Sequence, residues 1–215
     1  IRSLHQIMTG LKLHLLALAV LSVLLSQTQL LHSSVEIGSI SEVKGNAQVL
    51  RDKAYGAKLQ FDIQQMDDVR TESGRVAITF QDESTVKLTE HSKLVIDEYI
   101  YDPDPSKSKM ALKFASGTAR FITGKFNNKS NISIRTPTAD IAIRGTDFTC
   151  TVDELGRSLV ILLPDENGIS SGEILVSTAM GSVTLNKPYQ ATTVSVYENN
   201  PTKPVTLDIS LDLID

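Results

Sequence analysis

The 215-residue chain has no tryptophan, a single cysteine and four histidines. One cysteine cannot form a disulfide within the chain, so no internal disulfide framework holds the fold. His5, His14 and His32 lie in or beside the first 34 residues, which leaves His91 alone in the rest of the chain. A zinc site or a serine–histidine–aspartate triad would depend on this one residue. The sequence therefore predicts a non-enzymatic protein with no catalytic centre, no metal site and no cofactor.

Basic charge is also scarce. Lys and Arg number 21 against 25 Asp and Glu, which gives a formal net charge of −4. Proteins that bind nucleic acid or anionic lipid surfaces carry an excess of Lys and Arg. The composition therefore predicts no nucleic-acid partner, and the apolar content of 41% is typical of a packed globular chain.

Residues 15–25 form an apolar run that is broken only by Ser22 and preceded by Lys12. Its length fits the apolar region of a secretory signal peptide, roughly 7–15 residues. It is shorter than the roughly 20 apolar residues that span a membrane. We expect residues 1–34 to be a signal peptide helix or, if uncleaved, a short anchor that is the only contact with a membrane. The protein is then expected in the periplasm, outside the cell or at the cell surface.

From residue 35 onward, apolar and polar residues alternate. Val76, Ile78 and Phe80, for example, share one face of a strand, and turns rich in Gly, Ser and Asp separate such runs. Many short strands with regularly spaced turns indicate an all-β fold. We expect this domain over residues 35–198 and a C-terminal strand or truncated tail over residues 199–215. Any helix in the domain is expected to be one short piece, for which residues 60–68 are the one suitable place.

The most informative stretch lies between residues 135 and 148. Thr136 is biased toward an extended conformation because Pro137 follows it. A short strand then leads to Gly145, which lies in a tight turn where a positive φ is expected. After this turn Phe148 and Cys150 alternate along a strand. Cys150 is therefore expected to be a small buried hydrophobe rather than a reactive thiol.

This stretch resembles the signature of the FecR domain, an extracytoplasmic bacterial module with the pattern RTPTG-x-x-A-V-RGT-x-F. Ala139 stands where the pattern usually has a glycine, and Glu83 replaces the glycine of an earlier turn. Further motifs in the same order extend the resemblance over about residues 37–197. The residues that match the signature, for which we expect a structural role, are Arg135, Thr136, Pro137, Thr138, Arg144, Gly145, Thr146, Asp147 and Phe148.

The resemblance implies a β-solenoid or roll, in which short stacked strands share one core. A β-sandwich is the alternative, because alternation alone does not distinguish the two folds. FecR regulators sense a loaded outer-membrane receptor and control a sigma factor through a cytoplasmic helical domain. Only about a dozen residues precede the apolar run, too few for such a domain, so we expect no sigma-factor control unless sequence before Ile1 is missing.

The expected function is therefore that of an exported binding or scaffold module whose partner is an unknown envelope or surface protein. Two alternatives stay open. One is a module that binds carbohydrate or matrix at the cell surface. The other is the sensor part of a sigma-factor regulator, if sequence upstream of Ile1 is missing. Tyr99 and Tyr101 are the only near aromatic pair that a glycan platform could use.

Two groups of charged residues have a plain structural interpretation. Arg135 and Arg144 are expected to bond turn carbonyls or the nearby Asp140 or Asp147 rather than a partner. Four carboxylates cluster without the spacing of a calcium-binding loop. We expect them to be solvated. We expect a partner to be contacted by exposed loops such as residues 102–109 or by an unpaired strand edge. The four carboxylates are Asp97, Glu98, Asp102 and Asp104.

Overall fold

The computed structural model describes residues 36–125 and 131–208. These residues form 17 strands and one short 3-10 helix, which confirms the prediction of an all-β fold. No helix within them is long and apolar enough to cross a membrane. The expected signal peptide helix, residues 1–34, lies outside the described residues.

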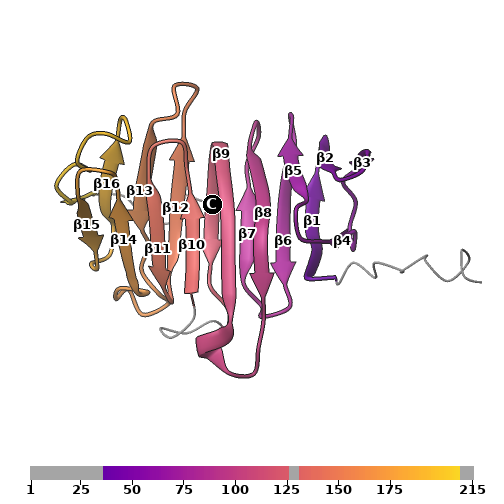
Figure 1. Cartoon of the computed structure of the whole chain (residues 1–215), viewed down its shortest axis with the longest axis horizontal. Coiled ribbons are helices and arrows are strands. Elements are labelled where there is room, and N and C mark those ends of the chain that lie inside the picture. The colour runs from indigo at the N-terminus through magenta and orange to yellow at the C-terminus, as the bar shows by residue number, and fades with distance from the viewer. Residues whose placement is uncertain (1–35, 126–130, 209–215) are drawn as a thin grey trace, which may run out of the picture. The chain divides into compact units, whose positions relative to one another are not determined.

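The strands form two layers that share one strand, β9 (Lys109–Ile122) (Figure 1). We call the layers sheet A and sheet B. In spatial order, sheet A contains β4 (Asp62–Ile63), β1 (Gly38–Lys44), β6 (Arg75–Phe80), β7 (Thr85–Leu88), β9, β12 (Asp147–Val152), β13 (Ser158–Leu162), β16 (Gln190–Val194) and β17 (Val205–Thr206). Sheet B contains β3 (Ala54–Gly56), β2 (Ala47–Leu50), β5 (Asp68–Thr71), β8 (Lys93–Ile100), β9, β10 (Asn131–Arg135), β11 (Asp140–Arg144), β14 (Glu173–Ser177) and β15 (Ser182–Leu185).

Strand β9 belongs to both sheets because its two halves have different neighbours. Its first half pairs with β8 and β10 in sheet B, and its second half pairs with β7 and β12 in sheet A. The change takes place near Gly117, which has a φ of +96°. A Cβ atom at Gly117 would lie 2.2 Å from the Ser92 hydroxyl oxygen, so only glycine fits this close approach.

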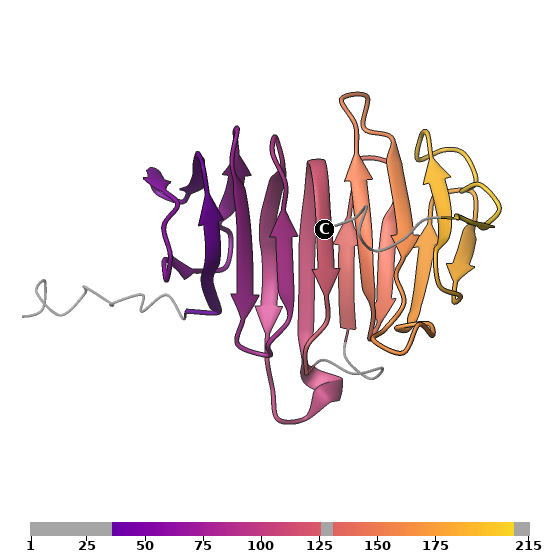
Figure 2. The ribbon, with the colours of Figure 1, turned by 180° about the vertical axis from the view of Figure 1, so that it is seen from behind.

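Successive segments of the chain add strands to sheet A and sheet B in turn. Two-strand hairpins in sheet A, such as β6–β7 and β12–β13, alternate with the hairpins β10–β11 and β14–β15 in sheet B (Figure 2). Among the described strands, every pair is antiparallel except β9–β10. Each sheet is open as far as the described strands go, because its two end strands each pair with one described neighbour only. The two sheets therefore grow in step from short strands.

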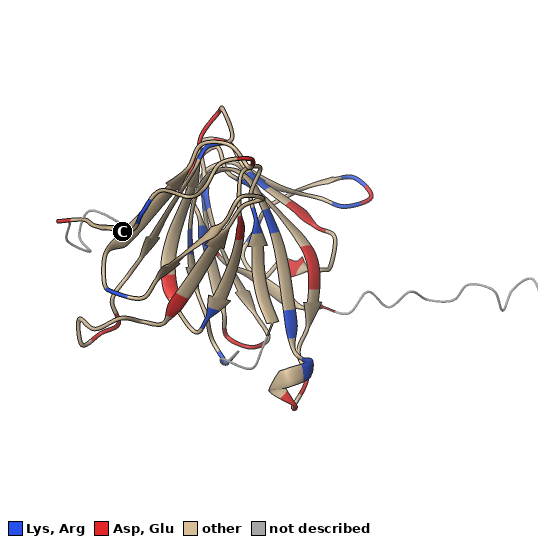
Figure 3. Cartoon of the chain, turned by 60° about the vertical axis from the view of Figure 1, so that its left-hand side comes forward, with Lys and Arg blue, Asp and Glu red and all other residues tan. Residues whose placement is uncertain are grey.

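The inward-facing side chains of both sheets form one continuous apolar core. Alternation along each strand places them there. Burial of each large apolar side chain contributes about 1.5–3 kcal/mol. Those that are completely buried include Ile40, Ile78, Phe114, Ile141, Phe148 and Leu162. Charged residues of both signs are interspersed over the outer strand faces and the loops (Figure 3).

The prediction of a short helix at residues 60–68 is wrong. Gln60 and Met66 have positive φ angles of 61° and 70°, which interrupt any helix, and β4 lies between them. The one helical turn within the described residues is instead the 3-10 helix η1 (Pro105–Lys107), in the loop between β8 and β9. Asp104 caps it, since its side chain accepts a hydrogen bond from the Ser106 N–H, and proline suits the first helical position.

Candidate functional site

The first half of the signature forms a turn between β10 and β11 that Thr136 closes. Oγ1 of Thr136 accepts hydrogen bonds from the N–H groups of Thr138 (3.3 Å) and Ala139 (2.9 Å). The Thr136 N–H donates to the Ala139 carbonyl at 2.9 Å. Ala139 has no positive φ. The turn therefore forms without the glycine that is usual at this position.

Hydroxyl groups join this turn to the other sheet. Oγ of Ser158, at the start of β13, lies 2.7 Å from Oγ1 of both Thr136 and Thr138. Thr138 also donates to the carbonyl of Gly156 at 2.9 Å. We call Thr136, Thr138 and Ser158 the hydroxyl cluster; all three are at most 6% exposed. The cluster ties sheet B to the β12–β13 hairpin of sheet A.

The second half of the signature takes the chain from β11 in sheet B to β12 in sheet A. Gly145 has a φ of +50°, which confirms the expected positive φ. The Thr146 N–H donates to Oγ1 of Thr123 at 2.7 Å, and the Asp147 N–H donates to Oγ of Ser171 at 3.0 Å. A Cβ atom on Gly172 would lie only 1.7 Å from the Gly145 carbonyl oxygen. The corner is therefore packed against the segment that precedes β14.

The charged residues of the signature pair with residues on the adjacent strand of the same sheet. Arg135 donates to Asp140 at 2.7 Å, as expected. Arg144 lies 3.5 Å from Glu173, which is opposite it across β11 and β14, so the expected contact with Asp147 is wrong.

Asp147 instead accepts two hydrogen bonds from Arg120, at 3.0 and 2.9 Å. Both side chains of this bidentate pair are 17% exposed. Phe148 follows inside the core, stacked on Phe121 with ring centroids 5.1 Å apart. Sequence reasoning missed the role of Arg120, since the partner is fixed by the pairing of β9 with β12.

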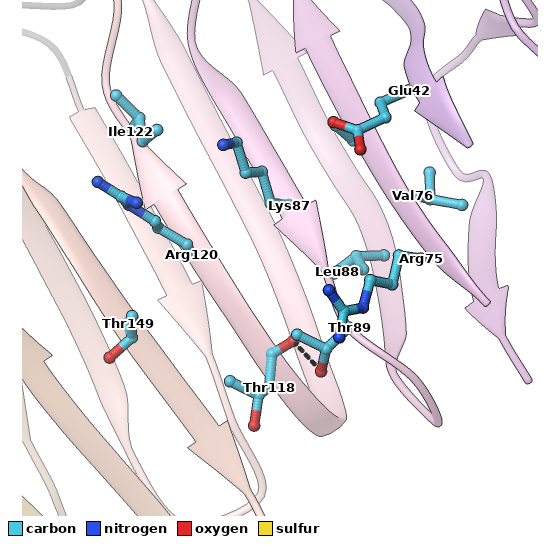
Figure 4. A pocket seen from close by; sticks show the side chains of 11 residues that line it. Glu42, Arg75, Val76, Lys87, Leu88, Thr89, Thr118, Arg120, Ile122 and Thr149 are labelled. Carbon is cyan, nitrogen blue, oxygen red and sulfur yellow. Dashed lines mark hydrogen bonds between the residues drawn. The ribbon is translucent and has the colours of Figure 1, made fainter. Parts of the chain in front are cut away.

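A groove of about 610 Å³ lies on the outer face of sheet A (Figure 4). Strand register places one row of residues across it: Glu42, Ala77, Lys87, Arg120 and Thr149 are successive neighbours on β1, β6, β7, β9 and β12. The groove is further lined by Arg75, Val76, Leu88, Thr89, Thr118 and Ile122. Three of the lining side chains are basic: Arg75, Lys87 and Arg120.

The sequence matches the family model described as FecR protein over residues 67–183, more than half of the chain. The chain belongs to the FecR family. The matched segment contains both signature turns, the hydroxyl cluster and all of β9. The FecR signature therefore coincides with the contacts that join the two sheets.

Solved structures show a similar fold. Two crystal structures, at 1.65 and 2.50 Å resolution, of a protein from Parabacteroides distasonis ATCC 8503 described as a candidate anti-sigma factor each align with a TM-score of 0.51 and 15% identity. Each alignment covers 66% of this chain and 60% of that chain. At this identity the likeness concerns the fold alone. The comparison with curated proteins finds no match.

The chain departs from the usual FecR pattern at Glu83, where the structure has a consequence. Glu83 lies in the turn between β6 and β7 and has a φ of +68°. A residue other than glycine is strained in this region. The side chain lies 2.6 Å from Lys125, an exposed ion pair that contributes little stability. The turn therefore keeps the conformation that a glycine would favour, but without the glycine.

Tyr99 and Tyr101 do not form an aromatic platform. A bulge in β8 between Ile96 and Glu98 turns Tyr99 into the core, where it is 5% exposed, while Tyr101 is 44% exposed. The interpretation as a glycan-binding module thus loses the aromatic pair on which it depended. Sequence alternation could not reveal this, because the bulge changes which residues face inward.

The hydroxyl of buried Tyr99 is paired with Asp82, which is itself fully buried. Tyr99 donates to Oδ1 of Asp82 at 2.9 Å and accepts from the Asp82 N–H at 3.0 Å. Burial raises the pKa of Tyr99 well above its usual value. Ser84 donates to the same carboxylate and accepts from the Gly124 N–H at 2.8 Å. These contacts fix the ends of β6, β8 and β9 relative to one another.

The remaining residues considered from sequence are placed as follows. His91 is exposed in the turn between β7 and β8, with a φ of 55°. Cys150 is a completely buried free thiol, as expected, and burial raises its pKa to about 12. Asp97 and Glu98 pair with lysines of β9, Lys113 and Lys109. Over residues 36–125 and 131–208, no group of three or more His, Cys, Asp or Glu could hold a metal ion.

Proposed function

We propose that this FecR protein is an exported, non-catalytic binding domain that acts by contact with a second protein of the cell envelope. Family membership and the fold shared with a candidate anti-sigma factor support a sensor domain of a FecR-type regulator as the specific form of this role. The apolar run at residues 15–25 supports a location outside the cytoplasm.

The observation that carries the proposal is the outer edge of β15 in sheet B. Among the described strands β15 pairs only with β14, so its other edge offers unpaired N–H and C=O groups. Ser182 and Thr184 are exposed on this strand, and Met180 beside it is 63% exposed. An extended segment of a partner can add to such an edge by main-chain hydrogen bonds, with neighbouring apolar side chains giving specificity.

Photo-crosslinking in the native host tests this. A photoreactive residue replaces Thr184, and we expect one discrete adduct with an envelope protein. The double variant Ser182→Lys/Thr184→Lys carries the photoreactive residue at position 180 instead. It should lose the adduct, because lysines on an edge strand block strand addition. Ser182→Ala/Thr184→Ala is the matched control and should retain it. An adduct that survives the lysines means that the edge is not the contact.

Two further variants test whether the exposed loop takes part in the contact and whether the protein is non-catalytic. Replacement of residues 102–109 by a Gly-Ser linker weakens the complex if this exposed loop adds to the contact, as the sequence predicts. His91→Ala should leave both stability and partner binding unchanged. A hydrolytic activity that His91→Ala abolishes would overturn the non-catalytic role.

A further inference from the structure

The groove on the outer face of sheet A combines positive charge with a hollow surface. Its row of neighbours places Lys87 directly opposite Arg120 across β7 and β9. Like charges at such positions repel each other. The bidentate pair with Asp147 neutralises Arg120. Lys87 and Arg75, by contrast, have no carboxylate within ion-pair distance anywhere in the described part of the chain.

A free hydroxyl faces the same groove. Thr149 lines it and is only 7% exposed. Its hydroxyl makes no hydrogen bond with any residue in the described ranges, whereas Thr118 bonds Thr151 and Thr89 bonds the Thr118 carbonyl. No buried side-chain oxygen of the described residues lacks a hydrogen-bond partner, so the Thr149 hydroxyl is open to the groove. Thr149 can donate to an acceptor that enters the groove.

The two free cations lie at different ends of the groove. Lys87 points toward Ile122, on the same side as Arg120, while Arg75 points toward Thr89 and Thr118 (Figure 4). A single small anion would meet only one of them. An extended ligand with two or more carboxylates meets both, and its aliphatic parts can lie over Ile122.

We propose that this groove binds an extended acidic peptide segment, rich in Asp or Glu, of the partner protein. The inference rests on the proposed contact function and adds a second surface to it, on the other sheet from β15. Glu42 is the one carboxylate among the described residues that line the groove, so the acidic side chains of the ligand lie away from it, near Arg75 and Lys87. The attraction is electrostatic, so binding should weaken as salt is raised.

Binding of a fluorescent hexaglutamate peptide to the purified chain, followed by anisotropy at low salt, tests the proposal. We expect the double variant Arg75→Gln/Lys87→Gln to bind at least tenfold more weakly. The matched control Lys109→Gln/Lys113→Gln changes the net charge equally but on β9 in sheet B, and should bind within twofold of the parent. Thr149→Val should weaken binding about threefold, and hexaglutamine should not bind.

Three results would overturn the proposal. Equal loss in the two double variants would mean that binding follows net charge rather than the groove. Binding of hexaglutamine would remove the role of the carboxylates. Displacement of the peptide by equimolar inorganic phosphate would reassign the groove to small anions. Melting temperatures of all variants should match the parent, and the crosslinking at β15 succeeds or fails independently of these outcomes.

Discussion

Thr136 and Ser158 place their hydroxyl oxygens 2.7 Å apart, although they are 22 positions apart in the sequence and belong to different sheets. Thr136 follows β10 in sheet B, and Ser158 begins β13 in sheet A. The pair is buried. The Ser158 hydroxyl also bonds that of Thr138, and the Thr136 hydroxyl also accepts from the Ala139 N–H. The Thr-Pro-Thr part of the FecR signature thus makes a direct contact between the two layers.

Ser158→Ala should lower the free energy of unfolding by about 1–3 kcal/mol, because two buried threonine hydroxyls lose their shared partner. In a domain of this size, each kcal/mol lowers the melting temperature by roughly 2–4 °C. Urea unfolding measures the change, and Ser182→Ala on the exposed edge strand is the control. A loss for Ser158→Ala no larger than that of the control would contradict the role of the hydroxyl cluster.

Glu83→Gly should stabilise the protein by about 0.5–1 kcal/mol, since glycine adopts a φ near +68° without strain. Glu83→Ala keeps the strain and also loses the exposed contact with Lys125, so it should give no gain. Thermal unfolding of the three proteins distinguishes the two causes. A gain of equal size in both variants would show that the carboxylate, and not the backbone, is unfavourable here.

Gly145→Val should destabilise the fold by about 1–3 kcal/mol through its backbone alone, because a Cβ atom at Gly145 meets nothing within 4 Å. Gly172→Ala should destabilise the fold more than Gly145→Val does. The cause at Gly172 is steric rather than conformational, because the added Cβ would collide with the Gly145 carbonyl. Denaturant titration compares the two, and an unchanged midpoint for Gly145→Val would show that the turn has no need of a positive φ.

Stability should fall at alkaline pH because of Cys150. Its thiol has a pKa of about 12 in the folded state and about 8.5 when unfolded. Between these values only the unfolded chain loses the proton, so each pH unit removes about 1.4 kcal/mol. The stability advantage of the parent over Cys150→Ala should therefore shrink by about 1–2 kcal/mol between pH 9 and 10.5. A difference that does not vary with pH would place the thiol in contact with solvent.

Fusion of residues 8–40 to alkaline phosphatase should give activity outside the cytoplasm, because the apolar run at residues 15–25 has the length of a secretory signal. Leu18→Asp introduces a charge into this run and should abolish the activity. Phosphatase assays on intact cells provide the measurement. An inactive parent fusion that stays in the cytosol would contradict export.

Alternation and turn residues were sufficient to predict much of the fold. Val76, Ile78 and Phe80 are buried as their spacing requires, and the positive φ of Gly145 follows from its place between two short strands. The sequence does not reveal that Tyr99 is buried while Tyr101 is exposed, because a β-bulge is a local irregularity with no clear mark in the sequence.

The contacts of the candidate site are harder to predict from alternation and turn residues. Lys87 and Arg120 can each be placed on an outer strand face from the sequence. That they lie opposite one another depends on the pairing of β7 with β9, which are not consecutive strands. The contact of Ser158 with the signature likewise depends on how the two sheets meet. Interactions between distant strands therefore set the limit of what the sequence alone predicts.

Strand β9 also decides how this protein can be divided. It is the shared neighbour of β7, β8, β10 and β12, so the segments before and after it cannot each be complete unless both retain it. A cut within residues 109–122 would leave four strands with an open side, whereas a duplicated β9 would supply each half with its own pairing edge. Split reporters and truncated fragments of this domain should therefore carry the whole of Lys109–Ile122 on both pieces.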